Sequence, residues 1–278
     1  FLIKSQQITS EELTQLYLNR IKKYNPILLA VTTTTEDRAL TQAKKADSEI
    51  RAGKYRGLLH GIPYGVKDLM TVDGYKTTWG AAPYKNQQLN YTASVIEKLD
   101  NAGAILIAKL TSGALARGDV WYGGKTKNPW DITQGASGSS AGPGSATAAG
   151  LVVFSLGTET LGSIVSPSSR CGLTGLRPTY GRVTRHGVMS LSWSMDKVGP
   201  MCSSAEDCAI VFAAIQGTDG KDRTVRDAAF NYEPNLNLKT LKVGYLKADF
   251  EKDTSAIGKN NQTTLITLKA MGLNPKEV

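Results

Sequence analysis

The chain has 278 residues, of which 41% are hydrophobic and 21% charged, a composition typical of globular proteins with one large domain or two small ones. Its formal net charge of +9 is spread along the sequence without a run of five basic residues, which favours a solvated basic surface over a nucleic-acid site. Three cysteines without a CxxC motif argue against a disulfide framework and a zinc centre, and no apolar run reaches the ~18 residues of a membrane span.

Two helices are predicted near the start of the chain. In residues 8–24, Thr9 and Glu12 match a capping box, and apolar residues then recur at helical spacing. The pair Asn25-Pro26 is expected to stop this helix. A second helix is predicted over residues 36–50, where alanine, leucine and isoleucine fall on one face.

The next stretches alternate strand and helix. Residues 61–70 form an apolar segment bounded by Gly and Pro, which predicts a strand carrying a single lysine, Lys67. Residues 92–110 predict a helix, a stop at Gly103 and then a buried strand over 105–109. This alternation indicates an α/β layered domain.

The remaining segments are expected as follows. A Gly-, Ser- and Pro-rich loop over 123–150 runs into an Ala-rich helix, and a continuous apolar run over 151–158 indicates a central strand. Residues 172–200 carry many turn signals, and residues 219–240 form the longest irregular segment. The other predicted elements are a capped helix over 204–217, a strand over 241–246 and a final helix over 257–271.

One candidate nucleophile is Ser140. It lies at the centre of GSSAG, residues 138–142, which matches the G-x-S-x-G pattern of a nucleophile elbow. An elbow needs a strand directly before it, and the Pro, Asp and Gly of residues 128–137 make a poor strand. Its histidine would have to be His186, one of only two in the chain. This interpretation is therefore weak.

A second candidate is Ser163 in GTETLGSIVSP, residues 157–167. It follows the apolar strand and lies in a Gly-containing turn, where α/β proteins usually carry functional groups. A serine hydroxyl needs a base, and since histidine is scarce, a lysine with a lowered pKa is the alternative. Lys67 fits, because burial in an apolar strand favours the neutral amine. A strand-end lysine paired with Asp68 is the competing interpretation, and both stay open at this point.

Three patches, in this order along the chain, resemble the amidase signature family. They are HGIPYGVKDL around Lys67, GSSAGPGSATAAGL from residue 138 and GTETLGSIVSPSSRCGLTGLRPTYGRV from residue 157. NPWD and SMDKVGP are similar to the family as well, and the resemblance covers most of residues 9–216. It implies an α/β layered fold whose mixed β-sheet core is covered by helices on both faces. Residues 1–278 would then be a single amidase-signature domain that lacks its C-terminal portion.

The resemblance also implies a Ser-cisSer-Lys triad that uses neither a cofactor nor a metal. Ser163 would be the nucleophile, Ser139 the bridging serine and Lys67 the base. The peptide bond between Gly138 and Ser139 would be cis. Four backbone N–H groups would form the oxyanion hole, those of Thr160, Leu161, Gly162 and Ser163.

Ser140 and Glu159 would support this site by hydrogen bonding. Several positions depart from the family pattern. Leu161 stands where the family commonly has glycine, Val165 where it often has an arginine that pairs with the acidic residue before the nucleophile, and Ala141 and Pro143 where small Gly or Ser residues are usual. Leu161 would be strained if its position needs a positive φ, and would otherwise narrow the pocket. Glu159 needs another partner, for which Arg170 and Arg177 are the candidates.

These observations favour an amidase that hydrolyses a small-molecule carboxylic amide through a Ser163 acyl-enzyme. The first alternative is the glutaminase subunit of a tRNA-dependent amidotransferase, the one case in which nucleic acid would be near. A non-catalytic binding protein on the same fold is the second alternative. The substrate and the oligomeric state stay open. A cytoplasmic location is favoured, and an exported form stays open because the chain begins at Phe1.

Overall fold

The computed structural model describes residues 1–255 and 258–278. The chain divides into two compact units, Phe1–Phe230 and Asn231–Val278, and each is described by itself. The first unit contains all three of the patches that carry the resemblance. The candidate site therefore lies within one unit.

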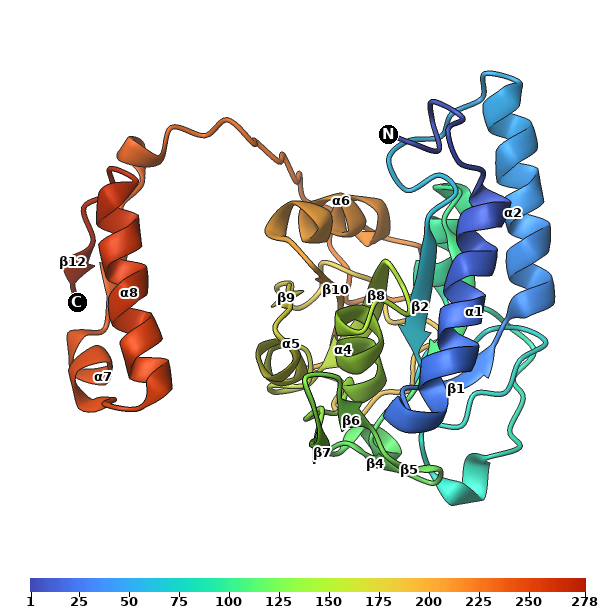
Figure 1. Ribbon diagram of the computed structural model, residues 1–278, viewed down its shortest axis with the longest axis horizontal. Helices are drawn as coiled ribbons and strands as arrows, with labels where there is room; N and C mark the ends of the chain where they lie inside the picture. Colours follow the sequence, from blue (N-terminus) through green and yellow to red (C-terminus); the bar gives the residue numbers. More distant parts are fainter. The chain divides into compact units, whose positions relative to one another are not determined.

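A mixed six-stranded sheet forms the centre of the first unit (Figure 1). Its order is β1 (Val31–Thr34), β3 (Ile105–Leu110), β2 (Pro63–Lys67), β8 (Phe154–Glu159), β10 (Lys197–Cys202) and β9 (Thr174–Gly175). The β2 strand pairs in parallel with both β3 and β8, whereas β1, β10 and β9 run antiparallel to their neighbours. The apolar run predicted as a central strand is β8, which is buried along its whole length. Sequence patterns did not indicate β1 or β10.

Helices cover both faces of this sheet, which confirms the predicted fold class. Ile105 and Ile107 of β3 pack into a core with α1 (Ser10–Leu28), α2 (Glu36–Arg51) and α4 (Ala141–Ala148). Leu106, between them, packs into the other core with α3 (Ser94–Asn101) and α6 (Ala205–Ile215). This alternation follows from the two-residue period of a strand, because successive side chains point to opposite faces. Helices α1 and α2 lie side by side (Figure 1).

The α1 helix begins as predicted but ends later. Thr9 is its N-cap, and the capping box with Glu12 is formed in both directions. The predicted stop at Asn25-Pro26 is wrong, since the helix continues through Pro26 to Leu28. A proline removes one N–H donor but keeps a helical φ, so a single lost bond near the end is tolerated. The Asn25 side chain then accepts the N–H groups of residues 30 and 31 and turns the chain into β1.

The segment expected as a loop over 123–150 contains more structure. Two short hairpins precede α4, formed by β4 (Val120–Trp121) with β5 (Gly124–Lys125) and by β6 (Lys127–Asn128) with β7 (Asp131–Gly135). The β7 residues were expected to break a strand, and they do form one, although it is largely exposed and outside the central sheet. An isolated hairpin tolerates Asp and Gly because it needs no buried side chains on either face. After α4, the first unit continues with α5 (Val165–Cys171) and then α6.

The second unit is small. It holds α7 (Lys247–Lys252), α8 (Ala256–Ala270) and a parallel pair of two-residue strands, β11 (Gly244–Tyr245) and β12 (Lys276–Glu277). The predicted final helix corresponds to α8, and the predicted strand over 241–246 is reduced to β11. The irregular segment 219–240 contains only a short 3-10 turn, Leu238–Thr240.

Candidate active site

The candidate site lies where the parallel strands β2 and β8 end. Lys67 is the last residue of β2, and Glu159 is the last residue of β8. Because the two strands pair in register from Tyr64 and Phe154 onward, their carboxyl ends reach the same edge of the sheet. Ligands of α/β proteins bind at such an edge. The loop that follows β8 carries Ser163.

Lys67 and Ser139 are in direct contact. Lys67 Nζ lies 2.7 Å from Ser139 Oγ and 2.9 Å from Thr158 Oγ1. All three side chains are buried, and Lys67 is completely so. The contact joins residues 72 positions apart in the chain, and the peptide bond between Gly138 and Ser139 is cis. Thr158 was not singled out by the sequence, because nothing in its local pattern distinguishes it from a strand threonine.

Burial lowers the pKa of Lys67 from 10.5 to about 7. Desolvation is the largest cause, and the negative charges of Asp196 and Glu159 oppose it. No carboxylate forms an ion pair with Lys67 among the residues that the structure describes. The amine is therefore partly neutral near pH 7, which a general base requires.

The competing interpretation of Lys67 as the partner of Asp68 is wrong. Asp68 Oδ1 lies 2.7 Å from Nζ of a different lysine, Lys109 on β3, and both side chains are fully buried. Lys109 Nζ also donates to the Lys76 carbonyl at 2.7 Å and to Thr77 Oγ1 at 2.5 Å. Lys109 thus has a counter-ion, whereas Lys67 has hydroxyl partners only.

Two hydrogen bonds tie the loop of Ser139 to the loop of Ser163. The Ser140 N–H donates to the carbonyl of Ser163 at 3.2 Å, and the hydroxyls of Ser137 and Ser166 lie 2.7 Å apart. Ser163 itself is half-buried, and its hydroxyl bonds to no other residue that the structure describes. The structure thus brings Lys67 and Ser139 into contact, and it bonds the backbone of Ser163 to Ser140, the residue that follows Ser139.

Ser140 is buried at the start of α4 and is bound to β8. Its hydroxyl donates to the Thr158 carbonyl at 3.0 Å and accepts from the Thr158 N–H at 3.2 Å. A Cβ added at Gly157 would come within 2.9 Å of Ser140 Oγ, so this close approach needs glycine. The elbow interpretation fails, since Nδ1 of His186 contacts the Ser94 hydroxyl instead, at 3.1 Å. Ser140 therefore fixes the loop of Ser139 onto the sheet.

Glu159 binds the backbone of the loop that carries Ser163. Its Oε2 accepts the N–H groups of Ile164 at 2.8 Å and Val165 at 3.0 Å, and its Oε1 lies 3.3 Å from the guanidinium of Arg177. Burial acts to raise the pKa of Glu159, but the N–H groups of Val165, Gly162 and Ile164, with Arg177, outweigh it and hold the pKa below its usual value. Of the two partners considered for Glu159, Arg177 makes the contact.

Arg170 lies elsewhere, because its guanidinium donates to Gln134 Oε1 at 2.8 Å. Leu161 avoids the strained backbone considered for it: the positive φ of the loop, +88°, falls on Gly162. The Leu161 side chain is 78% exposed. The departure from the family pattern thus changes the surface of the loop and leaves its backbone unstrained.

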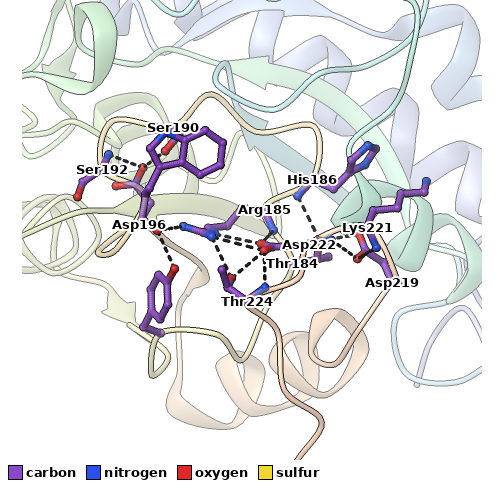
Figure 2. A network of polar contacts seen from close by, with 12 residues as sticks. Thr184, Arg185, His186, Ser190, Ser192, Asp196, Asp219, Lys221, Asp222 and Thr224 are labelled. Atoms are coloured by element: carbon purple, nitrogen blue, oxygen red, sulfur yellow. Dashed lines mark hydrogen bonds and ion pairs between the residues drawn. The ribbon is translucent and has the colours of Figure 1, made fainter.

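A second network, which the sequence did not predict, binds the loop of Ser163 through Asp196, just before β10, and Lys197, the first residue of β10. Asp196 accepts the hydroxyl of Thr160 through Oδ1, and its Oδ2 accepts the N–H groups of Leu191 at 2.7 Å and Ser192 at 2.9 Å. Figure 2 shows Asp196 beside Ser190 and Ser192. Lys197 Nζ donates to the Thr160 carbonyl at 3.0 Å. Residues 190–197 therefore support the first residue of the candidate oxyanion loop.

A cavity of about 440 Å³ opens next to this network. Thr158, whose hydroxyl contacts Lys67, lines it together with Asp196 and Lys197. The segment 221–224 also lines it, and Asp222 fixes this segment by an ion pair with Arg185 at 3.0 Å (Figure 2). The volume is in the range of small-molecule sites, and Lys67, Ser139 and Ser163 are not among the lining residues.

Among the residues that the structure describes, no group of three His, Cys, Asp or Glu side chains is arranged to hold a metal ion. In the same residues, none of the helices combines the length and apolar character of a membrane span.

The family model and the relatives found by comparison with known proteins agree with one another. The family model described as Amidase matches residues 12–278. The A subunit of glutamyl-tRNA(Gln) amidotransferase from Coxiella burnetii is 42% identical over 277 residues, covering 97% of this chain and 57% of the relative. The native peptide amidase from Stenotrophomonas maltophilia has a TM-score of 0.91 and 32% identity, covering 100% of this chain and 60% of that one.

The corresponding A subunit of glutamyl-tRNA(Gln) amidotransferase from Thermotoga maritima has a TM-score of 0.83 and 27% identity, covering 97% of this chain and 58% of that one. The chain thus spans less than two thirds of the length of each of these relatives.

Proposed function

This chain belongs to the amidase family, and we propose that its protein cleaves the C–N bond of a carboxylic amide through a covalent ester at Ser163. The observation that carries the proposal is the contact between Lys67 and Ser139, in which a fully buried amine with a pKa of about 7 lies 2.7 Å from a serine hydroxyl. A lysine held neutral in this way is suited to accept a proton and has no counter-ion to lose.

In the acylation step, Ser163 Oγ attacks the amide carbonyl carbon. Its proton passes to Ser139 Oγ while the Ser139 proton passes to Lys67 Nζ. Lys67 keeps an N–H for Thr158 Oγ1, which directs the amine lone pair toward Ser139. The carbonyl oxygen becomes an oxyanion and accepts N–H groups of the loop 160–163.

The C–N bond then breaks as the relay runs in reverse. Lys67 returns a proton to Ser139, and Ser139 passes its own to the leaving nitrogen, which departs as ammonia or an amine. Water attacks the resulting ester by the same relay. The carboxylic acid is released, and the Ser163 hydroxyl is restored.

Within the oxyanion loop, the structure supports some donors more than others. The N–H groups of Leu161 and Ser163 donate to no other residue that the structure describes, so both are available. The Gly162 N–H lies close enough to Glu159 to lower the pKa of that carboxylate. We therefore expect Leu161 and Ser163 to contribute most to the oxyanion hole, with Thr160 as the anchor of the loop.

The test is labelling by a fluorophosphonate or sulfonyl fluoride together with turnover of a panel of simple amides. Wild-type protein should be labelled at Ser163 and release ammonia or amine. Ser163→Ala should do neither, while Ser169→Ala, which changes an exposed serine on α5, should be labelled and active. Absence of labelling and turnover in folded wild-type protein would support a binding protein instead.

A second candidate function is the glutaminase activity of an amidotransferase subunit. The observation that favours it is the 42% identity to the amidotransferase protein of Coxiella burnetii, compared with 32% to the peptide amidase. Leu161 and Val165, which replace residues usual in the family, favour the stand-alone amidase. The two candidates differ in one measurement: glutamine hydrolysis that requires added amidotransferase partner subunits would select the second.

A further inference from the structure

We propose that Asp196 and Lys197 act as a clamp on Thr160, and that Lys197 strengthens the adjacent Leu161 N–H as a donor to the oxyanion. The inference rests on the proposed acyl-transfer function and adds two positioning residues to it. Neither residue touches the reacting atoms in this proposal. Both act through the backbone of the oxyanion loop.

The clamp is formed by two consecutive residues that bind the hydroxyl and the carbonyl of Thr160. Asp196 accepts the Thr160 hydroxyl, and Lys197 donates to the Thr160 carbonyl at 3.0 Å. Register fixes this arrangement, because Lys197 faces Glu159 in the β8–β10 ladder and Thr160 is the next residue. Asp196 is only 8% exposed, so its bonds are shielded from competing water.

Asp196 also connects the loop to a firmly bonded turn. Its Oδ2 accepts the hydroxyl of Ser190 at 3.1 Å and the N–H groups of Leu191 and Ser192. Four donors therefore meet on one carboxylate, three of them from residues 190–192. The bond to Asp196 holds Thr160 against the turn of residues 190–192, so the position of Thr160 does not depend on its own backbone conformation alone. A loop fixed in advance aims its N–H groups without reorganising during the reaction.

Lys197 has an electrostatic effect that Asp196 lacks. The Thr160 carbonyl and the Leu161 N–H belong to one planar peptide group, so they are the two ends of a single dipole. A cation that accepts electron density from the carbonyl makes the N–H at the other end a stronger donor. The Leu161 N–H has no acceptor among the described residues, so the oxyanion of the intermediate can take it.

Lys98 provides a matched control within the same unit. It is also a half-buried lysine that donates to backbone carbonyls, those of Gln216 and Gly217, each at 2.6 Å. These bonds lie on α3 and the end of α6, away from the residues around Ser163. A lysine that only stabilises the fold should behave like Lys98, whereas one that acts on the oxyanion should not.

The experiment compares Lys197→Met with Lys98→Met in the intact protein. Both variants are tested for kcat and KM on one amide, for inhibition by a trifluoromethyl ketone that forms a tetrahedral adduct with serine, and for inhibition by the product acid. For Lys197→Met we expect kcat to fall about 10- to 100-fold with KM little changed. Affinity for the ketone should fall by a similar factor, while affinity for the acid stays the same. Lys98→Met should lose stability only.

Lys197→Arg keeps a cationic donor and should recover most of the lost kcat. Unchanged kcat in Lys197→Met, or an equal fall in Lys98→Met, would overturn the proposal. If Lys197→Met does not fold, Thr160→Val removes the hydroxyl bond to Asp196 at nearly constant volume, and wild-type kcat in that variant would refute the clamp. Wild-type protein that is neither labelled at Ser163 nor active would refute the proposed function itself, a separate result.

Discussion

Replacement of Lys67 by methionine tests whether this buried lysine is held neutral in the folded protein. Its pKa is lowered from 10.5 to about 7, mainly by burial. At ~1.36 kcal/mol per pKa unit, the difference between a pKa of 10.5 and one of about 7 corresponds to about 5 kcal/mol of free energy linked to proton binding. Between these two pKa values the unfolded chain binds a proton at this site and the folded protein does not. The contribution of Lys67 to the free energy of unfolding of the wild-type protein therefore rises with pH over that range and is lowest below pH 7.

Lys67→Met removes this titration and nearly keeps the side-chain volume. Other groups titrate equally in both proteins, so the difference between their free energies of unfolding isolates Lys67. From pH 6 to pH 9 this difference should change by about 2.7 kcal/mol in favour of wild type. Urea unfolding followed by tryptophan fluorescence at several pH values measures it. The variant should lose labelling and turnover at every pH.

Two outcomes would refute the reasoning. Parallel stability profiles for wild type and Lys67→Met from pH 6 to pH 9 would show that the lysine keeps an ordinary pKa in the folded state. Amide turnover retained in Lys67→Met would show that the base is a different residue. Loss of the Lys67 contacts with Ser139 and Thr158 changes the difference in free energy of unfolding by the same amount at every pH. This loss therefore cannot produce the predicted dependence on pH.

Four further outcomes are expected. The rate constant kcat/KM should rise with pH up to about 7 and then level off, because the relay needs neutral Lys67; a pH–rate profile with no inflection between 6 and 8 would contradict this. Thr158→Val should lower kcat about tenfold with the fold intact, as circular dichroism can verify, since Lys67 loses the acceptor that orients it. Glu159→Gln should cost about 1–3 kcal/mol in urea unfolding, because a charged acceptor of one buried and one part-buried N–H group is lost; a change below about 0.5 kcal/mol would count against it. Leu161→Gly should change KM for bulky amides more than for small ones, and equal effects on both would place this exposed side chain away from the substrate.

The layers of the fold could be predicted where periodicity is strong. The helix α2 and the strand β8 have continuous patterns, and both lie close to their predicted positions. The strand β10 was missed because KVGPMC contains Gly199 and Pro200, which normally break a strand. Here the Pro200 carbonyl still accepts the Leu176 N–H at 3.0 Å, so the missing donor leaves the pairing with β9 in place.

The residues of the candidate site likewise fall into those that the sequence could identify and those that it could not. Lys67, Ser139 and Ser163 could be named from motifs, because the chemistry restricts those positions to particular residue types. Thr158 and Asp196 could not, since their roles depend on contacts across 91 and 36 residues that no local pattern encodes. The prediction that residues 1–278 form one domain lacking its C-terminal portion stays a prediction, as do the roles assigned to the triad.

The departures at Leu161 and Val165 have a common physical explanation. The arginine that the family often has two residues after the position of Ser163 is absent at Val165, yet the charge of Glu159 is met by Arg177 instead. A glycine is absent at Leu161, yet the position that needs a positive φ is Gly162. In both cases the backbone of the loop keeps its support while an exposed side chain changes, Val165 at 41% and Leu161 at 78% exposure. We therefore expect substitutions at Leu161 and Val165 to change the surface around Ser163 while the backbone N–H groups of the loop keep their positions.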